Sequence, residues 1–280
     1  MIDVEPYIEN PSRLKSHIDK RLQVECLQHK LRETYADTSI PPSAILFLMG
    51  VHRLPGRPHA EPCILLNERS KRVRQAGDLC FPGGGIMDRL DPILARLLKL
   101  PGFPLSRWPH WSYWKRHHPG TARRIALFLA TGLRESFEEI RLNPLRIDFL
   151  GPMPSEKLVL FHQVIFPVVG WLDRQQHLKP NWEVAQIIYL PLRDFFSPGN
   201  YARLHLRLDQ RAVGKTPAPI ESDYLCFISP TDTGTTPLWG ATFRIILTFL
   251  AVVFGYNPPE LSALPMISGK LEKNYAKSRP

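Results

Sequence analysis

The sequence predicts an α/β protein built on a mixed central sheet. Apolar, β-branched segments typical of strands recur along the chain, and amphipathic segments typical of helices lie among them without strict alternation. The 280 residues, 44% of them hydrophobic, are enough to bury a full core. These observations favour a sheet covered by helices over an all-helical or all-strand fold.

The first part of the chain predicts a helix followed by two strands. Leu14 and Ile18 begin a run of apolar residues at helical spacing, so we interpret residues 1–40 as an N-terminal helical arm. Residues 41–54 and 62–70 are apolar and rich in β-branched residues, with glycine and prolines between them. We expect two strands joined by a turn.

The central part predicts a loop, an insertion and a long helix. Residues 77–88 form a glycine loop, and residues 92–124 are a tryptophan-rich segment with "RWPHWSYWKRHHPG" at its centre. A helix is expected from about Thr121 to Arg141, because "NP" follows it and disfavours further helix.

The remaining elements are mainly strands. They are expected within residues 147–153, 159–172, 183–196 and 223–229, with a short helix at the end of the third. A final helix spans residues 238–256, and we expect "SGKLEKNYAKSRP" to be frayed. The predicted division is therefore an arm at 1–40, a domain at 41–256 and a tail at 257–280.

Composition excludes several classes of protein. No apolar run reaches the roughly 18 residues of a membrane span, and the polar N-terminus lacks the apolar segment of a signal peptide. We therefore expect a cytoplasmic protein. The four cysteines form no C-x-x-C pair, which argues against a disulfide framework or a zinc site. The net charge of +10 favours nucleic acid, an anionic membrane or a phosphorylated small molecule as partner.

Three carboxylates crowd into one short helical stretch, "GLRESFEEIRL". Glu135, Glu138 and Glu139 are neighbours at i, i+3 and i+4, so they face the same direction. Arg134 can pair with Glu138 but leaves the other two unpaired. Such a set suits Mg²⁺ or Mn²⁺, although an acidic, solvated helix face is the commoner reading of a triplet standing alone.

A glycine loop precedes this helix in the chain. In "FPGGG", Gly83 and Gly84 have no side chain to keep a phosphate or a metal away from the backbone. Taken together, "FPGG…RESFEE" resembles the box of the Nudix hydrolases, a loop–helix–loop unit with the pattern Gly-x5-Glu-x7-Arg-Glu-aliphatic-x-Glu-Glu-x-Gly. The resemblance implies an α/β/α sandwich with a mixed central sheet.

The box departs from the family pattern in four ways. Residues 92–124 interrupt it, and Asp91 stands where the first acidic residue is expected. Ser136 replaces an aliphatic residue, and Arg141 replaces a glycine. Since that glycine has a conformational task, we expect Arg141 to end the helix in another way, and the insertion to bulge out before the helix begins.

The segment "ILLNERSKRVRQAGDLCFPGG" is similar to the signature of the coenzyme A diphosphatase branch of the Nudix hydrolases. The matching residues are Leu65, Leu66, Arg69, Ser70, Arg74, Gly77, Phe81, Pro82, Gly83 and Gly84. Asn67 stands in place of a threonine, and the spacing from Ser70 to Gly77 is one residue short. Further segments extend the resemblance from about Ile45 to Leu250.

The resemblance implies roles for the residues of the helix and the loop. Glu135, Glu138 and Glu139 would hold Mg²⁺ or Mn²⁺, one of them helping to deprotonate water, while Arg134 orients the helix through an ion pair.

The resemblance also assigns roles outside the helix. Glu183 would act as another ligand or as general base, and a plain surface glutamate is its alternative. Arg69 and Arg74 would bind phosphate together with Gly83 and Gly84, with solvated strand-end charges as the alternative for the arginines.

Two further features carry less weight. His110, His117 and His118 lack matching cysteine or carboxylate ligands for zinc. The tryptophan-rich segment could stack on nucleic acid, but we expect a self-packed insertion that lids the substrate site or forms a homodimer contact. Nucleic acid is not the expected partner.

The expected function is metal-dependent hydrolysis of a diphosphate bond in a small nucleotide. By resemblance, coenzyme A or acyl-CoA would be cleaved to 4′-phosphopantetheine and adenosine 3′,5′-bisphosphate. Two alternatives stay open: the same chemistry on ADP-ribose, NADH or a dinucleoside polyphosphate, and a non-catalytic module of this fold that binds nucleotide or RNA.

Overall fold

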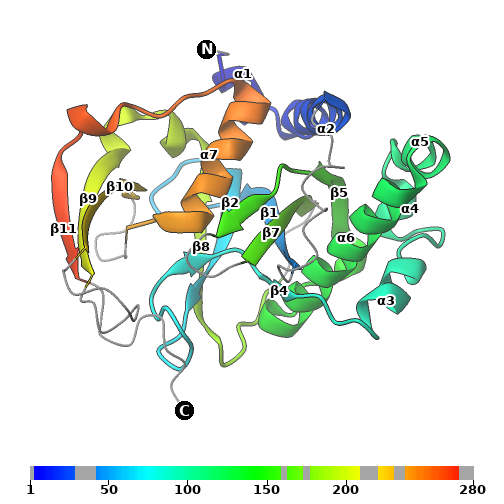
Figure 1. The fold of residues 1–280 in the computed structure, drawn as a ribbon. Coiled ribbons are helices and arrows are strands. Elements are labelled where there is room, and N and C mark those ends of the chain that lie inside the picture. The colour runs from blue at the N-terminus through cyan, green and yellow to red at the C-terminus, as the bar shows by residue number, and fades with distance from the viewer. Residues whose placement is uncertain are drawn as a thin grey trace.

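The protein is an α/β/α sandwich in which helices cover both faces of a mixed sheet (Figure 1). The computed structural model describes residues 3–28, 42–158, 163–172, 177–208, 220–229 and 237–270. The predicted fold class is confirmed.

The central sheet is built around β1 (Pro42–His52), which pairs in parallel with β7 (Gln163–Leu172) and antiparallel with β2 (Glu61–Arg69). The path runs β3-β2-β1-β7-β5, while β4, β6 and β8 pair with β1, β7 and β2. The other bounds are β3 Leu79–Cys80, β4 Gly83–Gly85, β5 Ile147–Pro152, β6 Glu156–Leu158 and β8 Val184–Pro191.

Strand β1 divides the core in two because successive side chains point to opposite faces. Leu46 and Leu48 pack in the cluster that contains helix α6 (Pro119–Ile140), while Phe47 and Met49 pack in the cluster of α2 and α7. The continuous apolar run of β1 is therefore covered by helices on both faces of the sheet.

Helix α6 confirms the long helix predicted for residues 121–141, and Pro119 occupies its first turn. The helix ends at Arg141, which adopts the left-handed conformation with φ 57°. The amide of Arg141 donates to the carbonyl of Phe137 at 3.0 Å, the single bond of a left-handed helix ending. Arg141 thus takes the conformation that glycine usually supplies.

The insertion folds into short helices on the α6 side of the sheet. These are α3 (Asp91–Leu97), α4 (Pro104–Arg107) and α5 (Trp111–His117).

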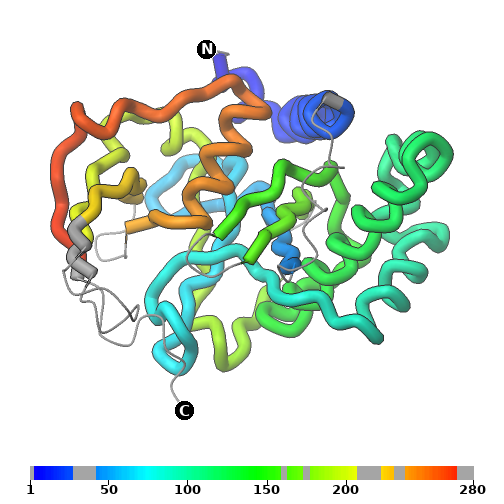
Figure 2. Tube along the Cα trace, viewed as in Figure 1, coloured from blue at the N-terminus to red at the C-terminus, as the bar shows by residue number. Residues whose placement is uncertain are grey.

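Helix α2 (Pro11–Gln28) follows the short α1 (Glu5–Ile8) and packs beside α7 (Gly240–Phe254) on the other face (Figures 1 and 2). Leu14, Ile18 and Leu22 are fully buried in this cluster. The helix was predicted correctly, but its description as an arm is wrong, because it completes the core. Residues 29–40 of the predicted arm lie outside the described residues.

A second sheet was not predicted. β9 (Tyr201–Leu208) pairs antiparallel with β10 (Ile220–Phe227) and parallel with β11 (Met266–Lys270). β11 lies in the segment predicted as tail, so the expectation of fraying is wrong up to Lys270, and the rest of the tail is outside the described residues. The short helix after β8 is a 3-10 helix, Leu192–Phe196.

Among the residues that the structure describes, no helix combines the length and the apolar character needed to cross a membrane. The four cysteines are free thiols, as the sequence predicts.

Candidate active site

The C-terminal half of α6 carries the three predicted glutamates, which differ in exposure. Glu135 is largely buried, with 17% of its side chain exposed, and the pKa of Glu139 responds to the charge of Glu135. Glu138 is half exposed, and one of its oxygens lies 3.4 Å from a guanidinium nitrogen of Arg134. The charge of Glu138 nevertheless raises the pKa of Glu135, and Nη1 of Arg134 donates to both carboxylates. Glu138 therefore belongs to the same group and lies at its exposed edge.

The glycine loop meets α6 at Glu135. Gly83 and Gly84 pair with Ile45 and Ala44 of β1, which fixes the loop on the central strand. A Cβ on Gly84 would lie 2.3 Å from Oε1 of Glu135, far inside van der Waals contact. Only glycine at this position leaves room for the carboxylate.

Asp91 closes the box that the insertion interrupts. Its Oδ1 accepts from Nε of Arg134 at 2.7 Å, and its Oδ2 accepts from Nη2 of Arg134 at 3.2 Å and from the hydroxyl of Thr131 at 2.8 Å. Arg134 also donates to the carbonyl of Gly85 at 3.0 Å and to Glu135 at 2.9 Å. One guanidinium thus joins the loop, the start of the insertion and the helix.

Hydrogen bonds and the charge of Arg134 lower the pKa of Asp91. Although burial opposes it, the bonds from Arg134, Met87 and Thr131 hold the pKa of Asp91 below its usual range. Asp91 is fully buried and Arg134 is 8% exposed, so the pair is shielded from solvent.

Glu139 is the most perturbed carboxylate of the site. Burial raises its pKa to about 8, and the negative charge of Glu135 adds to this. Its Oε2 accepts from Nδ2 of Asn67 at 2.7 Å. Asn67 is 1% exposed on β2, and the sequence analysis noted it only as a replacement for threonine. A polar residue inside an apolar strand was the signal that could have identified it.

Glu183 is brought next to Glu139 by the segment before β8, which packs against the C-terminal end of α6. The amides of Lys179 and Asn181 donate to the carbonyls of Ile140 and Glu139 at 2.9 and 2.7 Å. The amide of Ser70 donates to the carbonyl of Glu183 at 2.8 Å, so β2 holds the same segment. The charge of Glu183 raises the pKa of Glu139, which places the two carboxylates in one group.

Arg69 stands at the edge of this group. Its Nε donates to the carbonyl of Arg74 at 2.7 Å, and it lies 3.9 Å from the sulfur of Cys80. The charges of both Arg69 and Glu139 act on the Cys80 thiol, so these two side chains flank Cys80. Arg74 is exposed on the β2–β3 loop.

The oxygen donors are of the kind that a hard cation prefers, but the side chains do not stand close enough together to coordinate one. Among the residues that the structure describes, no three His, Cys, Asp or Glu side chains stand close enough together to hold a metal ion. Glu135, Glu139 and Glu183 offer only oxygen, and Gly84 has no side chain to separate Glu135 from the loop.

The tryptophan-rich insertion is anchored away from the glutamates. Trp108, Trp111 and Trp114 are at most 7% exposed. The indoles of Trp108 and Trp114 donate to Asp19 and Gln23 of α2 at 3.1 and 2.9 Å. Trp114 lies just before α6, whose first residue is about 24 Å along the helix axis from Glu135 at 1.5 Å per residue. These tryptophans are packed core, not a lid.

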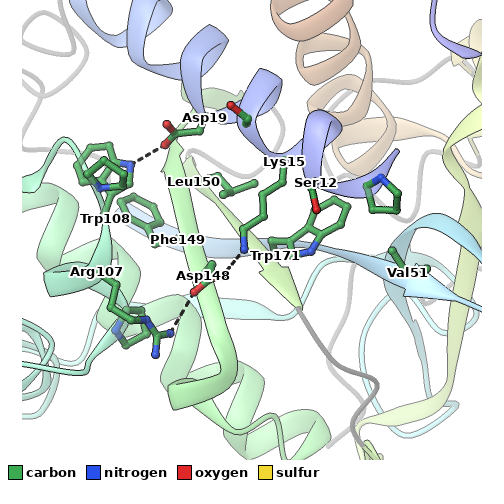
Figure 3. Close-up of a pocket in the computed structure, with 14 residues that line it drawn as sticks. Ser12, Lys15, Asp19, Val51, Arg107, Trp108, Asp148, Phe149, Leu150 and Trp171 are labelled. Atoms are coloured by element: carbon green, nitrogen blue, oxygen red, sulfur yellow. Dashed lines mark hydrogen bonds and ion pairs between the residues drawn. The ribbon is translucent and has the colours of Figure 1, made fainter. Parts of the chain in front are cut away.

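The groove in Figure 3 is separate from the glutamates. It measures about 570 Å³ and lies between α2, the α4 segment and β5. Lys15 and Arg107 both pair with Asp148 in its wall, so its charges are largely compensated within the protein. None of the predicted site residues lines it.

Comparison with known proteins gives sequence relatives of one kind. The chain is 30% identical over 155 residues to a protein named uncharacterized Nudix hydrolase NudL from Pectobacterium atrosepticum, covering 55% of this chain and 62% of the relative. The protein of the same name from Citrobacter koseri is 28% identical over 149 residues, covering 52% and 59%. The chain thus spans about three fifths of these relatives. No family model matches.

Solved structures give weaker similarities. A Nudix hydrolase from Alicyclobacillus acidocaldarius has a TM-score of 0.37 at 17% identity, covering 57% of this chain and 82% of that one. A MutT/nudix family protein from Enterococcus faecalis has a TM-score of 0.39 at 11% identity, covering 87% and 74%. Scores below 0.5 do not identify a fold by themselves. The sequence similarity of this chain is thus to proteins named as Nudix hydrolases, over about half of its length.

Proposed function

We propose that this protein is a divalent-metal-dependent hydrolase that cleaves a diphosphate bond in a nucleoside diphosphate derivative. The observation that carries the proposal is the contact between the glycine loop and α6, where Gly84 makes room for Glu135 and Arg134 ties both segments to Asp91. In this proposal, backbone amides of the loop, the carboxylates and Arg69 would surround the diphosphate.

Each side chain has a task that follows from its position. Glu135, Glu139 and Glu183 would hold Mg²⁺ or Mn²⁺, which when bound supplies positive charge for the phosphate oxygens and makes water more acidic. Arg134 fixes Glu135, and Asn67 fixes Glu139. Glu138 is half exposed and close to Arg134. Its side chain would reach the metal by rotating away from Arg134. Glu183 is our candidate for general base.

Phosphate binding would fall to the arginines and the loop. Arg69 and Arg74 lie at the two ends of one hydrogen-bonded turn, and a guanidinium presents several donors to a phosphate. Gly83 and Gly84 allow close approach of the substrate to the backbone.

Coenzyme A or acyl-CoA is the substrate we propose first, on the resemblance of residues 64–84 to the coenzyme A diphosphatase signature. A cytoplasmic location remains a prediction. The alternative substrates are ADP-ribose, NADH and dinucleoside polyphosphates, because the Ser70–Gly77 spacing departs from that signature. Stacking of RNA bases on the tryptophan-rich segment is disfavoured, because Trp108, Trp111 and Trp114 are buried.

The test is incubation of the purified protein with coenzyme A and Mg²⁺ or Mn²⁺, with products separated by chromatography. We expect 4′-phosphopantetheine and adenosine 3′,5′-bisphosphate, and loss of both with Glu135→Gln and Glu139→Gln. A panel of the alternative substrates is run in parallel. Products from another substrate alone would replace coenzyme A, and no metal-dependent turnover of any substrate would exclude the hydrolase.

A further inference from the structure

Helix α3 carries an exposed apolar stripe. Ile93 and Leu97 of α3 are 54 and 42% exposed, at the i, i+4 spacing that places residues on one side of a helix. Leu90 and Leu100, which flank the helix, are 38 and 48% exposed and complete the stripe. The opposite side packs against α6 through buried residues, Asp91, Ala95 and Leu98. A surface helix normally turns polar residues outward, so this stripe (the α3 stripe) needs a partner.

The α3 stripe lies at the rim of the molecule. Figure 1 shows α3 at the outer edge, beyond α6 and away from the second sheet, and Figure 2 shows the chain turning back beside it. The turn contains Pro101 and Gly102, both exposed. The stripe and the turn are therefore exposed at one edge of the fold.

Cations border the stripe. Arg89, Arg96 and Lys99 are exposed between residues 86 and 102, and Asp88 is the exposed acid of that segment. The other acid, Asp91, is buried against Arg134. The segment thus presents aliphatic side chains beside a net positive charge, on a protein of net charge +10.

We propose that the α3 stripe docks the protein on an anionic lipid surface. Aliphatic side chains on one face of a helix with Lys and Arg beside them are the pattern of helices that lie in the membrane interface. A lipid surface is fluid, so the stripe could bind it without a partner of complementary shape. This inference does not depend on the proposed hydrolase function.

A second copy of the chain fits the stripe less well. A symmetric contact through this face would bring both sets of Arg89, Arg96 and Lys99 together, and like charges across an interface oppose association. Protein interfaces also favour aromatic side chains in their centre, whereas the stripe contains only leucine and isoleucine.

The test is co-sedimentation of the full chain with phosphatidylcholine vesicles, with and without phosphatidylserine. We expect binding to the anionic vesicles, weakened by salt. Ile93→Ser with Leu97→Ser should lower binding about tenfold or more. Replacing Arg89, Arg96 and Lys99 by glutamine should lower it about fivefold per charge.

Ile228→Ser with Met266→Ser is the matched control, because these side chains are 40 and 57% exposed near the second sheet. It should bind vesicles as the unchanged protein does. Circular dichroism and thermal unfolding check that the stripe variants fold, and Ile93→Gln alone serves if the double variant does not.

Two results would overturn the proposal. One is failure to sediment with anionic vesicles, or equal sedimentation of the stripe and control variants. The other is a dimer by light scattering that Ile93→Ser with Leu97→Ser dissociates, which would assign the stripe to a second copy.

Discussion

Asp91 and Arg134 lie 43 positions apart in the chain, yet the carboxylate of one accepts from the guanidinium of the other at 2.7 Å. The intervening residues form α3, α4, α5 and the first part of α6. The buried pair holds the start of the insertion against α6. The glycine loop and the helix can therefore lie together although a long insertion separates them in the chain.

Removing Asp91 should destabilise the protein strongly. Asp91→Ala leaves Arg134, whose side chain is 5% exposed, without its main partner. Breaking a buried pair typically costs about 3–5 kcal/mol. We expect a loss of about 3 kcal/mol in the free energy of unfolding, measured with urea in the presence of a chelator. Asp88→Ala, at an exposed neighbour, should change the free energy of unfolding by less than about 0.5 kcal/mol. An equal effect of the two changes would show that the Asp91–Arg134 pair does not stabilise the protein.

Gly84→Ala should disturb the site and leave the fold intact. The new Cβ would meet the carboxylate end of Glu135, which can move without shifting the backbone. Because a displacement of about 1 Å can cost about a hundredfold in rate, we expect metal-dependent hydrolysis and the metal-induced rise in melting temperature to fall sharply.

Gly85→Ala is the control for this change, since a Cβ there meets nothing within 4 Å. It should keep both activity and the metal response. If the two alanine variants behave alike, the contact between Gly84 and Glu135 does not matter for the site.

Trp114 should contribute to stability and its neighbour Tyr113 should not. Trp114 is 3% exposed and donates to Gln23 of α2, whereas Tyr113 is 41% exposed. Trp114→Ala should lower the free energy of unfolding by about 3–5 kcal/mol, against less than about 1 kcal/mol for Tyr113→Ala. Urea unfolding of both variants measures this. If Tyr113→Ala lowered the free energy of unfolding more than Trp114→Ala, the insertion would act through its surface and not through its buried tryptophans.

His52 should make the protein acid-sensitive. It is 3% exposed, its Nε2 has no hydrogen-bond partner among the described residues, and burial lowers its pKa from 6.5 to about 4. The unfolded chain therefore binds a proton between pH 6.5 and 4 that the folded protein does not bind, and stability falls as the pH falls through this range.

The loss from His52 should reach about 2 kcal/mol at pH 4.5. His52→Gln should remove this part of the pH dependence, while His59→Gln, at an exposed position, should follow the unchanged protein. Urea unfolding at pH 7.5 and 4.5 provides the comparison. Parallel pH profiles for the protein and His52→Gln would show that His52 is not responsible.

Much of the fold could be predicted from local patterns. The apolar runs of β1, β2, β5 and β7 and the helical pattern of α6 each carry their own signal, because burial on both faces or on one stripe needs a specific periodicity. β11 has no such signal: its five residues become a strand only through pairing with β9. Short segments whose order depends on a distant partner escape sequence analysis.

The candidate site shows the same division. Spacing along a helix predicted that Glu135, Glu138 and Glu139 share a direction and that Arg134 can pair with Glu138. It did not predict that Arg134 also bonds to Glu135 and Asp91. Asn67 was noted as a substitution, and its contact with Glu139 depends on how β2 lies against α6.

By itself the sequence determined the elements of the box, their order and the chemical kind of site, because carboxylates, glycines and arginines carry those properties locally. Only the tertiary structure decided which groups meet. It closed the interrupted box through Asp91 and Arg134, turned Glu138 toward solvent, added Asn67 and placed α2 in the core. Each of these contacts joins segments far apart in the chain, and their geometry follows from the packing of whole layers.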